Sequence, residues 1–182
     1  GTLLNDTITI STNANNLEAY ASAGSDAYTG STNGSTGDSW ENDTVRYDKL
    51  YYLNQLELSK SGNNVLVKKP DGSVDTLSNM EWIRTKGDSG SIKTPLATYV
   101  KNGGTEHAGS IFADTITVSD TNISRARLGD GDDTYTFAAG TDNWDYQKVY
   151  PGKGNDTINF TGTGDFIVRF EGSYERYDVS FW

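Results

Sequence analysis

Two short segments of the chain bring glycines together with oxygen-bearing side chains, a combination that suits a hard cation. They read Leu128-Gly129-Asp130-Gly131-Asp132-Asp133-Thr134-Tyr135 and Pro151-Gly152-Lys153-Gly154-Asn155-Asp156-Thr157-Ile158. Glycine permits the left-handed backbone that turns carbonyl oxygens toward a cation, and the aspartates add negative charge. Calcium takes roughly six to eight oxygen ligands in flexible geometry, whereas magnesium demands stricter octahedral order. These segments therefore predict calcium bound between neighbouring turns.

The predicted calcium ligands come from these two turns and from three further aspartates. They are Gly129, Asp130, Gly131, Asp132, Asp133, Gly152, Gly154, Asn155 and Asp156, together with Asp114, Asp142 and Asp145. Ordinary hairpin turns are the alternative, because Asp, Asn and Gly favour those as well. Two full copies with a threonine and an apolar residue at the same offsets favour the cation site, with several ions bound.

A four-residue unit, Asp-Thr-apolar-Thr, recurs along the chain and predicts the strands that carry these turns. Its copies begin at Asp6, Asp43, Asp114, Asp133 and Asp156, some with a changed fourth residue, and a looser copy begins at Asp26. Successive copies lie 20, 17, 71, 19 and 23 residues apart. The four spacings near 20 predict stacked rungs of a coil, and the gap of 71 predicts an insertion. The apolar position, as at Tyr135 or Ile158, should fill the interior while its neighbours face outward.

The two glycine turns resemble the RTX nonapeptide, Gly-Gly-x-Gly-x-Asp-x-apolar-x, with the first glycine lost from each. This resemblance implies an all-β fold, a calcium-bound β-roll whose solenoid-like rungs are split by an inserted antiparallel β-meander. We expect one calcium-dependent domain over residues 1–182, with rungs in 1–47 and 106–182 and a capping meander in 48–105. The turns before the remaining copies lack most of the glycines, so metal-free rungs are expected among them.

The inserted segment reads as strands that close the end of a roll. Alternating apolar residues over 56–77 predict a three-stranded meander, and such a cap would protect an open solenoid edge. Met80, Trp82 or Ile83 should then pack inward. Residues 16–21 are interpreted as a single helical turn.

Composition narrows the classes of protein that the chain can belong to. Fifteen basic residues against 25 acidic ones give a net charge of −10, which disfavours nucleic acid and anionic membrane surfaces as partners and favours a cation. Twenty glycines and three prolines are typical of many turns joined by short strands. Without cysteine no disulfide can stabilise the fold, so bound calcium is expected in that role. No apolar run is long enough for a membrane span.

The sequence does not point to a catalytic site, and we expect no enzymatic activity. Cysteine is absent, and the single histidine, His107, is interpreted as an exposed loop residue. Carboxylates are so numerous that any pair could be named as acid and base, so their presence decides nothing. The Gly-x-Gly turns precede strands, whereas a dinucleotide site would need a helix there.

The resemblance is strongest to the calcium-rich, ligand-binding domains of large bacterial RTX adhesins, which mediate attachment and biofilm formation. It implies an extracellular or cell-surface module of a larger protein exported by type I secretion, monomeric in isolation, that binds a cell-surface peptide, protein or glycan. Asp142, Trp144 and Tyr146 are the predicted ligand contacts, because an oxygen-rich loop around an indole could offer an aromatic platform. Packing of Trp144 under its own loop is the alternative.

Two other functions remain open. The chain could be the carboxy-terminal RTX module of a secreted enzyme, serving its folding and export. Such modules usually carry uninterrupted nonapeptides, whereas the repeats here are interrupted and about twice as far apart, which favours the adhesin. The other possibility is a small polysaccharide-active β-solenoid.

Overall fold

The computed structural model is almost entirely β-structure, which confirms the predicted all-β class. It describes residues 4–9, 18–31, 43–101, 105–119, 123–137, 147–161 and 166–170. In these ranges the only helical element is the short 3-10 turn η1 (Leu53–Gln55), and no helix is long and apolar enough to span a bilayer. The helical turn expected within 16–21 is wrong, because Glu18–Tyr20 is strand β2.

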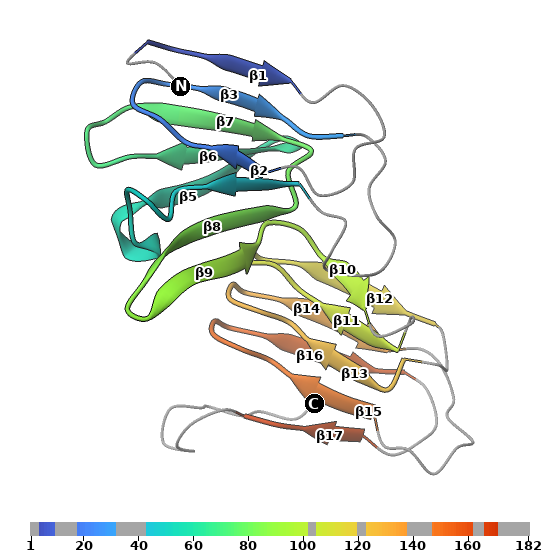
Figure 1. The fold of residues 1–182 in the computed structure, drawn as a ribbon. Helices are drawn as coiled ribbons and strands as arrows, with labels where there is room; N and C mark the ends of the chain where they lie inside the picture. The colour runs from blue at the N-terminus through green and yellow to red at the C-terminus, as the bar shows by residue number, and fades with distance from the viewer. Residues whose placement is uncertain are drawn as a thin grey trace. The chain divides into compact units, whose positions relative to one another are not determined.

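The chain divides into two compact units, Gly1–Leu96 (unit 1) and Ala97–Trp182 (unit 2). Over the described residues of unit 1, strands are found in two sheets (Figure 1). The first has the order β1 (Thr7–Thr9), β3 (Ala27–Thr29), β7 (Val74–Ser78), β6 (Asn64–Lys68), β5 (Glu57–Ser61), and the second β2, β4 (Thr44–Arg46), β8 (Trp82–Gly87), β9 (Gly90–Pro95).

Unit 2 repeats this arrangement in its own described residues. One sheet has the order β10 (Tyr99–Lys101), β11 (Glu106–Ala108), β13 (Arg125–Arg127), β15 (Gln147–Tyr150), β17 (Phe166–Val168), and the other β12 (Thr115–Val118), β14 (Thr134–Phe137), β16 (Thr157–Phe160). From β11 onward consecutive strands alternate between the two sheets, while strands one rung apart pair in parallel. This connectivity defines a parallel β-solenoid of the β-roll type.

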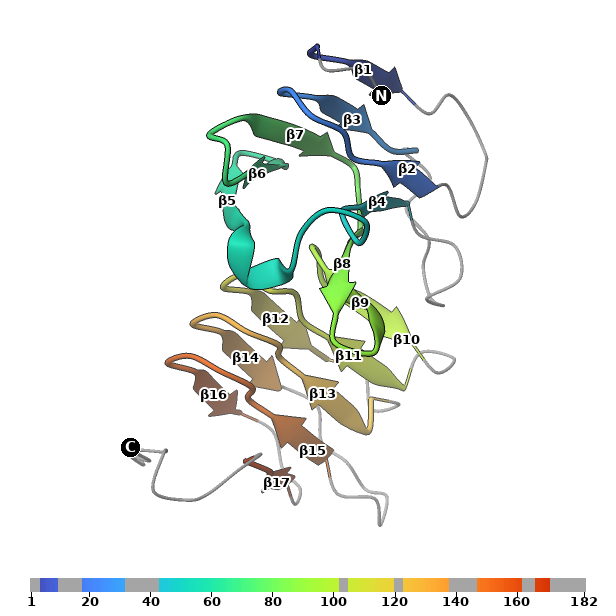
Figure 2. The same ribbon diagram turned by 60° about the vertical axis from the view of Figure 1, so that its left-hand side comes forward.

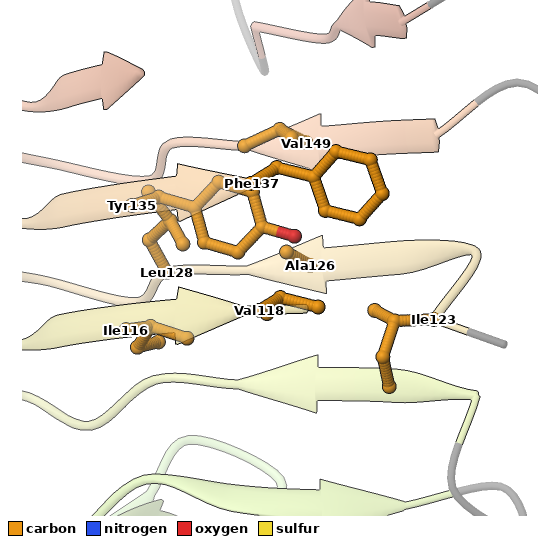
Figure 3. Close-up of a cluster of buried hydrophobic side chains, with 8 residues drawn as sticks. All are labelled: Ile116, Val118, Ile123, Ala126, Leu128, Tyr135, Phe137 and Val149. Atoms are coloured by element: carbon orange, nitrogen blue, oxygen red, sulfur yellow. The ribbon is translucent and has the colours of Figure 1, made fainter. Parts of the chain in front are cut away.

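The predicted rungs are confirmed in unit 2, because successive copies of the repeat lie in register. Ile116 pairs with Tyr135, which pairs with Ile158. Alternate side chains of β14 are buried, as a period of two residues requires. Tyr135 and Phe137 from this strand meet Ala126 and Val149 of the opposite sheet in a core cluster (Figure 3).

Unit 1 corrects one part of the repeat assignment. β4, which follows Asp43, lies in the second sheet between β2 and β8, so Asp43 does not continue the line of Asp6 and Asp26. That line continues at Asp75-Thr76-Leu77-Ser78, where β7 pairs in parallel with β3. The spacing of 17 misled because each rung crosses both sheets, and the strand that follows Asp43 has the same residue pattern as the strands of the first sheet.

The segment expected to cap the roll contains the predicted meander. Strands β5, β6 and β7 pair antiparallel in sequence order, with the β5–β6 hairpin at one edge of the sheet (Figure 2). Met80, Trp82 and Ile83 are buried, as predicted. Since β7 and β8 also pair in parallel with β3 and β4, part of residues 48–105 belongs to the rungs themselves.

Candidate metal centre

The two glycine-rich turns lie directly against each other in unit 2. The first joins β13 to β14 and the second joins β15 to β16. Asp130 and Lys153 form a parallel bridge, in which Gly131 N donates to Lys153 O (2.8 Å) and Lys153 N donates to Gly129 O (3.1 Å). The sequence prediction that neighbouring turns stack is therefore confirmed at these positions.

Glycine is required at the point of closest approach between the turns. Gly131 and Gly154 have φ values of +124° and +129°, which L side chains rarely adopt. A Cβ on Gly154 would overlap the carbonyl oxygen of Gly131, and a Cβ on Gly131 would overlap the backbone at residues 112 and 113. The turns can stack at this distance only because these positions carry no side chain.

Aspartates at the ends of these turns form a ladder along one edge of the unit 2 roll. Asp114 N donates to Asp133 Oδ1 (2.8 Å), and Asp133 N donates to Asp156 Oδ1 (3.0 Å). Asp133 and Asp156 thus each accept a backbone hydrogen bond from the rung before. The ladder fixes the rungs in register and places carboxylates in a column, which raises the electrostatic free energy unless a cation or protons offset it.

The middle carboxylate of this ladder carries an uncompensated oxygen. Asp133 is 1% exposed, and its Oδ2 has no hydrogen-bond partner among the described residues. Burial, together with the nearby carboxylates of Asp156, Asp114 and Asp132, raises the pKa of Asp133 to about 7. A buried anionic oxygen without a donor is costly, so this position favours a positive ligand.

Unit 1 contains the same ladder, but its charge is offset from within the chain. Asp6 N donates to Asp26 Oδ1 (2.9 Å), and Asp26 N donates to Asp75 Oδ1 (2.9 Å). The Lys69 ammonium, with a fully buried side chain, lies 2.8 Å from Asp75 Oδ1. Tyr47 OH donates to Asp75 Oδ2 (2.7 Å), and burial beside Asp75 raises the pKa of Tyr47 well above its usual value.

The other predicted ligands fall into three groups. Asp132, on the exposed side of its turn, accepts a hydrogen bond from Asn155 N (2.8 Å). Asp130 is engaged in an exposed ion pair with Lys153 (2.9 Å). The remaining predicted positions lie outside the described residues. They are the predicted calcium ligands Asp142 and Asp145, and Trp144 and Tyr146, which are predicted to contact a peptide or glycan together with Asp142. The structure thus brings the residues of the two turns together with Asp114, which belongs to the rung before the first turn.

Sequence reasoning missed three residues of the unit 1 ladder. Asp75 could have been found, since Asp75-Thr76-Leu77-Ser78 nearly repeats the unit, but the meander pattern concealed it. Lys69 and Tyr47 carry no sequence signal for this role, because only the fold brings them to Asp75. The interpretation of His107 as an exposed loop residue is wrong: it is half-buried in β11.

The residues at the stacked turns suit a calcium ion. Across the described ranges, no group of three or more His, Cys, Asp or Glu side chains is arranged to hold a metal. A cation here must therefore take backbone carbonyls together with carboxylates, a ligand set that calcium accepts and zinc disfavours. Asp133 Oδ2, which has no hydrogen-bond partner among the described residues, would supply the anionic ligand that such an ion requires.

Fold and site together define a parallel β-roll with acidic, glycine-bearing turns. No family model matches the chain, and no curated protein matches it. Among solved structures it is similar to the crystal structure of extracellular lipase LipA from Serratia marcescens, with 13% identity and a TM-score of 0.27. The match covers 95% of this chain and 32% of that one, so the chain spans about a third of its length. What this chain binds must be inferred from its own geometry.

Proposed function

We propose that the chain is an extracellular, calcium-dependent β-roll module of a large bacterial surface protein of the RTX adhesin kind. One observation carries the calcium part of this proposal. Asp133 Oδ2 is buried without a hydrogen-bond partner among the described residues, beside two stacked glycine turns. The oxygen-rich turns and the net charge of −10 point to a cation as the missing partner.

The ion would be held by residues of both turns. The carbonyl groups of Gly129 and Gly131 and the carboxylates of Asp133 and Asp156 are the ligands that the fold offers. Bound calcium would supply the positive charge that offsets this column of carboxylates. The chain's own part is to fix the turns in register through the aspartate ladder and through the glycines that let the turns stack.

Calcium also couples folding to location. Where free calcium is scarce, as in the cytosol, repulsion among the ladder carboxylates would keep unit 2 loose enough for export. Outside the cell, metal binding energy becomes folding energy. We therefore place the folded module outside the cell or at its surface, as part of a larger secreted protein.

The recognition part of the proposal rests on residues 140–146. Trp144 with Asp142 and Tyr146 would form an aromatic and acidic contact surface for a peptide, protein or glycan on another surface. We propose no catalytic step for this chain. A folding and export module of a secreted enzyme is the alternative.

Thermal unfolding of the chain in calcium, in magnesium and in chelator tests the calcium part. Calcium at roughly 100 times its Kd should stabilise the folded chain by about 2.7 kcal/mol, and magnesium should stabilise it less. Asp156→Ala should abolish most of this response, whereas Asp71→Ala, which removes a fully exposed carboxylate from a unit 1 turn, should leave it intact. Equal melting temperatures in calcium and chelator would overturn the proposal.

A panel of peptides and glycans, added to the calcium-loaded chain, tests the recognition part. One ligand class should raise the melting temperature further, and Trp144→Ala should remove that increment without changing the calcium response. A calcium response with no ligand response would favour the folding and export module. Release of sugars from a glycan would instead identify an enzyme.

A further inference from the structure

Lys69 stands out among the basic residues of the described chain because its entire side chain is buried. Its ammonium donates to the carbonyl oxygens of Ser22 (3.0 Å) and Gly24 and lies 2.8 Å from Asp75 Oδ1. Two backbone carbonyls and a carboxylate are the ligand types that bind calcium in proteins. The ammonium is thus bound as a metal ion would be, by a turn and by the aspartate of the next rung.

The backbone hydrogen bonds show which residues of the two ladders correspond. Asp26 N donates to Asp75 as Asp133 N donates to Asp156. Thr76 N donates to Asp26 O (2.8 Å), as Thr157 N donates to Asp133 O (2.7 Å). Asp26 therefore corresponds to Asp133, and Asp75 to Asp156.

The carbonyl ligands of Lys69 correspond as well. Ser22 and Gly24 precede Asp26 by four and two residues, as Gly129 and Gly131 precede Asp133. Gly24 has a positive φ of +94°, and Gly131 has a positive φ of +124°. The Lys69 ammonium therefore lies where unit 2 offers the Gly129 and Gly131 carbonyls and Asp156.

The described part of unit 2 holds no equivalent of Lys69. No lysine or arginine there pairs with Asp133 or Asp156, and the described ion pairs of this unit join other residues. Ser22 Oγ donates to Asp26 Oδ2 (2.9 Å), whereas Gly129, at the corresponding position, has no side chain to reach Asp133. Among its described residues, unit 2 therefore offers neither of the internal partners that unit 1 supplies.

We infer that Lys69 is a tethered cation that takes, in unit 1, the position that calcium takes in unit 2, so that the unit 1 roll forms without metal. The inference rests on the calcium proposal for unit 2. It also assigns a latent metal site, because removal of the ammonium would leave the Ser22 and Gly24 carbonyls and Asp75 facing an empty position that suits a divalent cation.

Hydrogen exchange of the full chain, followed peptide by peptide in calcium and in chelator, separates the two units. In the wild type, β3 and β7 should keep their protection in chelator while β14 and β16 lose theirs. Lys69→Met should lower the protection of β3 and β7 in chelator by roughly 100-fold, because a buried carboxylate loses its partner. The neighbouring Lys68→Met is the control: Lys68 is half-exposed and pairs with exposed Glu57, so protection should not change.

Lys69→Ala supplies the second measurement, in the presence of calcium. This variant should bind an additional calcium ion by equilibrium dialysis and regain protection of β3 and β7. A variant that binds no additional calcium and stays unprotected would overturn the inference, as would a Lys69→Met variant that behaves like Lys68→Met.

Protection of different peptides tests the Lys69 inference and the calcium proposal. Loss of β3 and β7 protection from the wild type in chelator would overturn the Lys69 inference, even if neither Lys69 variant folds. Full protection of β14 and β16 in chelator would instead overturn the calcium proposal for unit 2.

Discussion

Asp26 in unit 1 and Asp133 in unit 2 hold the same place in their ladders, yet their second carboxylate oxygens have different surroundings. Asp26 Oδ2 accepts hydrogen bonds from Ser22 Oγ (2.9 Å) and Tyr28 OH (3.2 Å). Asp133 Oδ2 has no partner in the described chain, although Tyr135 follows it at the same offset. The Tyr135 hydroxyl instead accepts a hydrogen bond from Gln147 Nε2 (3.1 Å).

This difference shows how one backbone scaffold can serve two electrostatic solutions. The ladder of backbone N–H groups and aspartates is common to both units and sets the register. Offsetting the buried charge is a separate task, done in unit 1 by Lys69 and hydroxyl groups. In unit 2 we assign it to the proposed calcium ion. Since an unpaired buried charge is costly, the two units should respond to calcium unequally.

The glycine contact between the turns should give the largest effect. Gly154→Ala forces a Cβ onto the Gly131 carbonyl at a φ of +129°, so it should lower the free energy of unfolding of calcium-loaded unit 2 by about 3 kcal/mol or more. Gly62→Ala in unit 1 is the matched control, with a φ of +60° and open space around the new Cβ, and should cost about 1 kcal/mol. Hydrogen exchange of β16 and β6 reports the two losses, and equal losses would contradict tight stacking of the turns.

In chelator, Asp133 and Asp26 should respond to the same substitution with opposite signs. At pH 8 in chelator, Asp133→Asn should raise the stability of unit 2 by about 1–2 kcal/mol, because it removes a buried charge and keeps the oxygen that accepts from Asp114 N. In calcium the same variant should be less stable than the wild type, since an ion ligand is lost.

Asp26→Asn should instead lower the stability of unit 1 by about 1–2 kcal/mol in both media, because charge-assisted hydrogen bonds from Ser22 and Tyr28 are weakened. Hydrogen exchange measures the unfolding of each unit separately, for both variants, in calcium and in chelator. If Asp133→Asn destabilised unit 2 in chelator as well, its carboxylate would have an internal partner.

The repeat in the sequence predicted the rungs because its information is local. Aspartate, a β-branched residue and an apolar residue at fixed offsets specify a turn followed by a half-buried strand, so Ile116, Tyr135 and Ile158 could be placed in register without a structure. The glycines of the two full turns likewise indicated where backbones approach closely. Local pattern was insufficient at Asp43, since strands of both sheets share the same period of two residues.

The charge balance of the ladder could not be predicted in this way. Lys69 lies 43 residues after Asp26, and it reaches the turn that precedes Asp26 only when β7 pairs with β3. In the sequence it is one of two adjacent lysines, and nothing local separates it from exposed Lys68. Whether a turn binds an ion or a lysine thus depends on long-range contacts, which a repeat motif does not encode.

The second sheet of unit 1 gives the smallest predicted effect and tests whether this unit responds to protons and not to calcium. Glu81 Oε2 accepts a hydrogen bond from Asp43 N (2.8 Å), and burial raises the pKa of Glu81 above its usual value of 4.5. The folded state then binds the proton more tightly than the unfolded state does. The contribution of Glu81 to stability is therefore complete below its ordinary pKa of 4.5, and is lost as the pH rises through its pKa in the folded state.

Glu81→Gln should remove this pH dependence while its amide oxygen still accepts from Asp43 N. At neutral pH the variant should be more stable than the wild type by less than about 1 kcal/mol, with the same difference in calcium and in chelator. Denaturant unfolding from acid to neutral pH measures the change, with exposed Glu57→Gln as the control. A stabilisation that appeared only in chelator would show that Glu81 belongs to a calcium site, and unit 1 would then depend on metal in its second sheet.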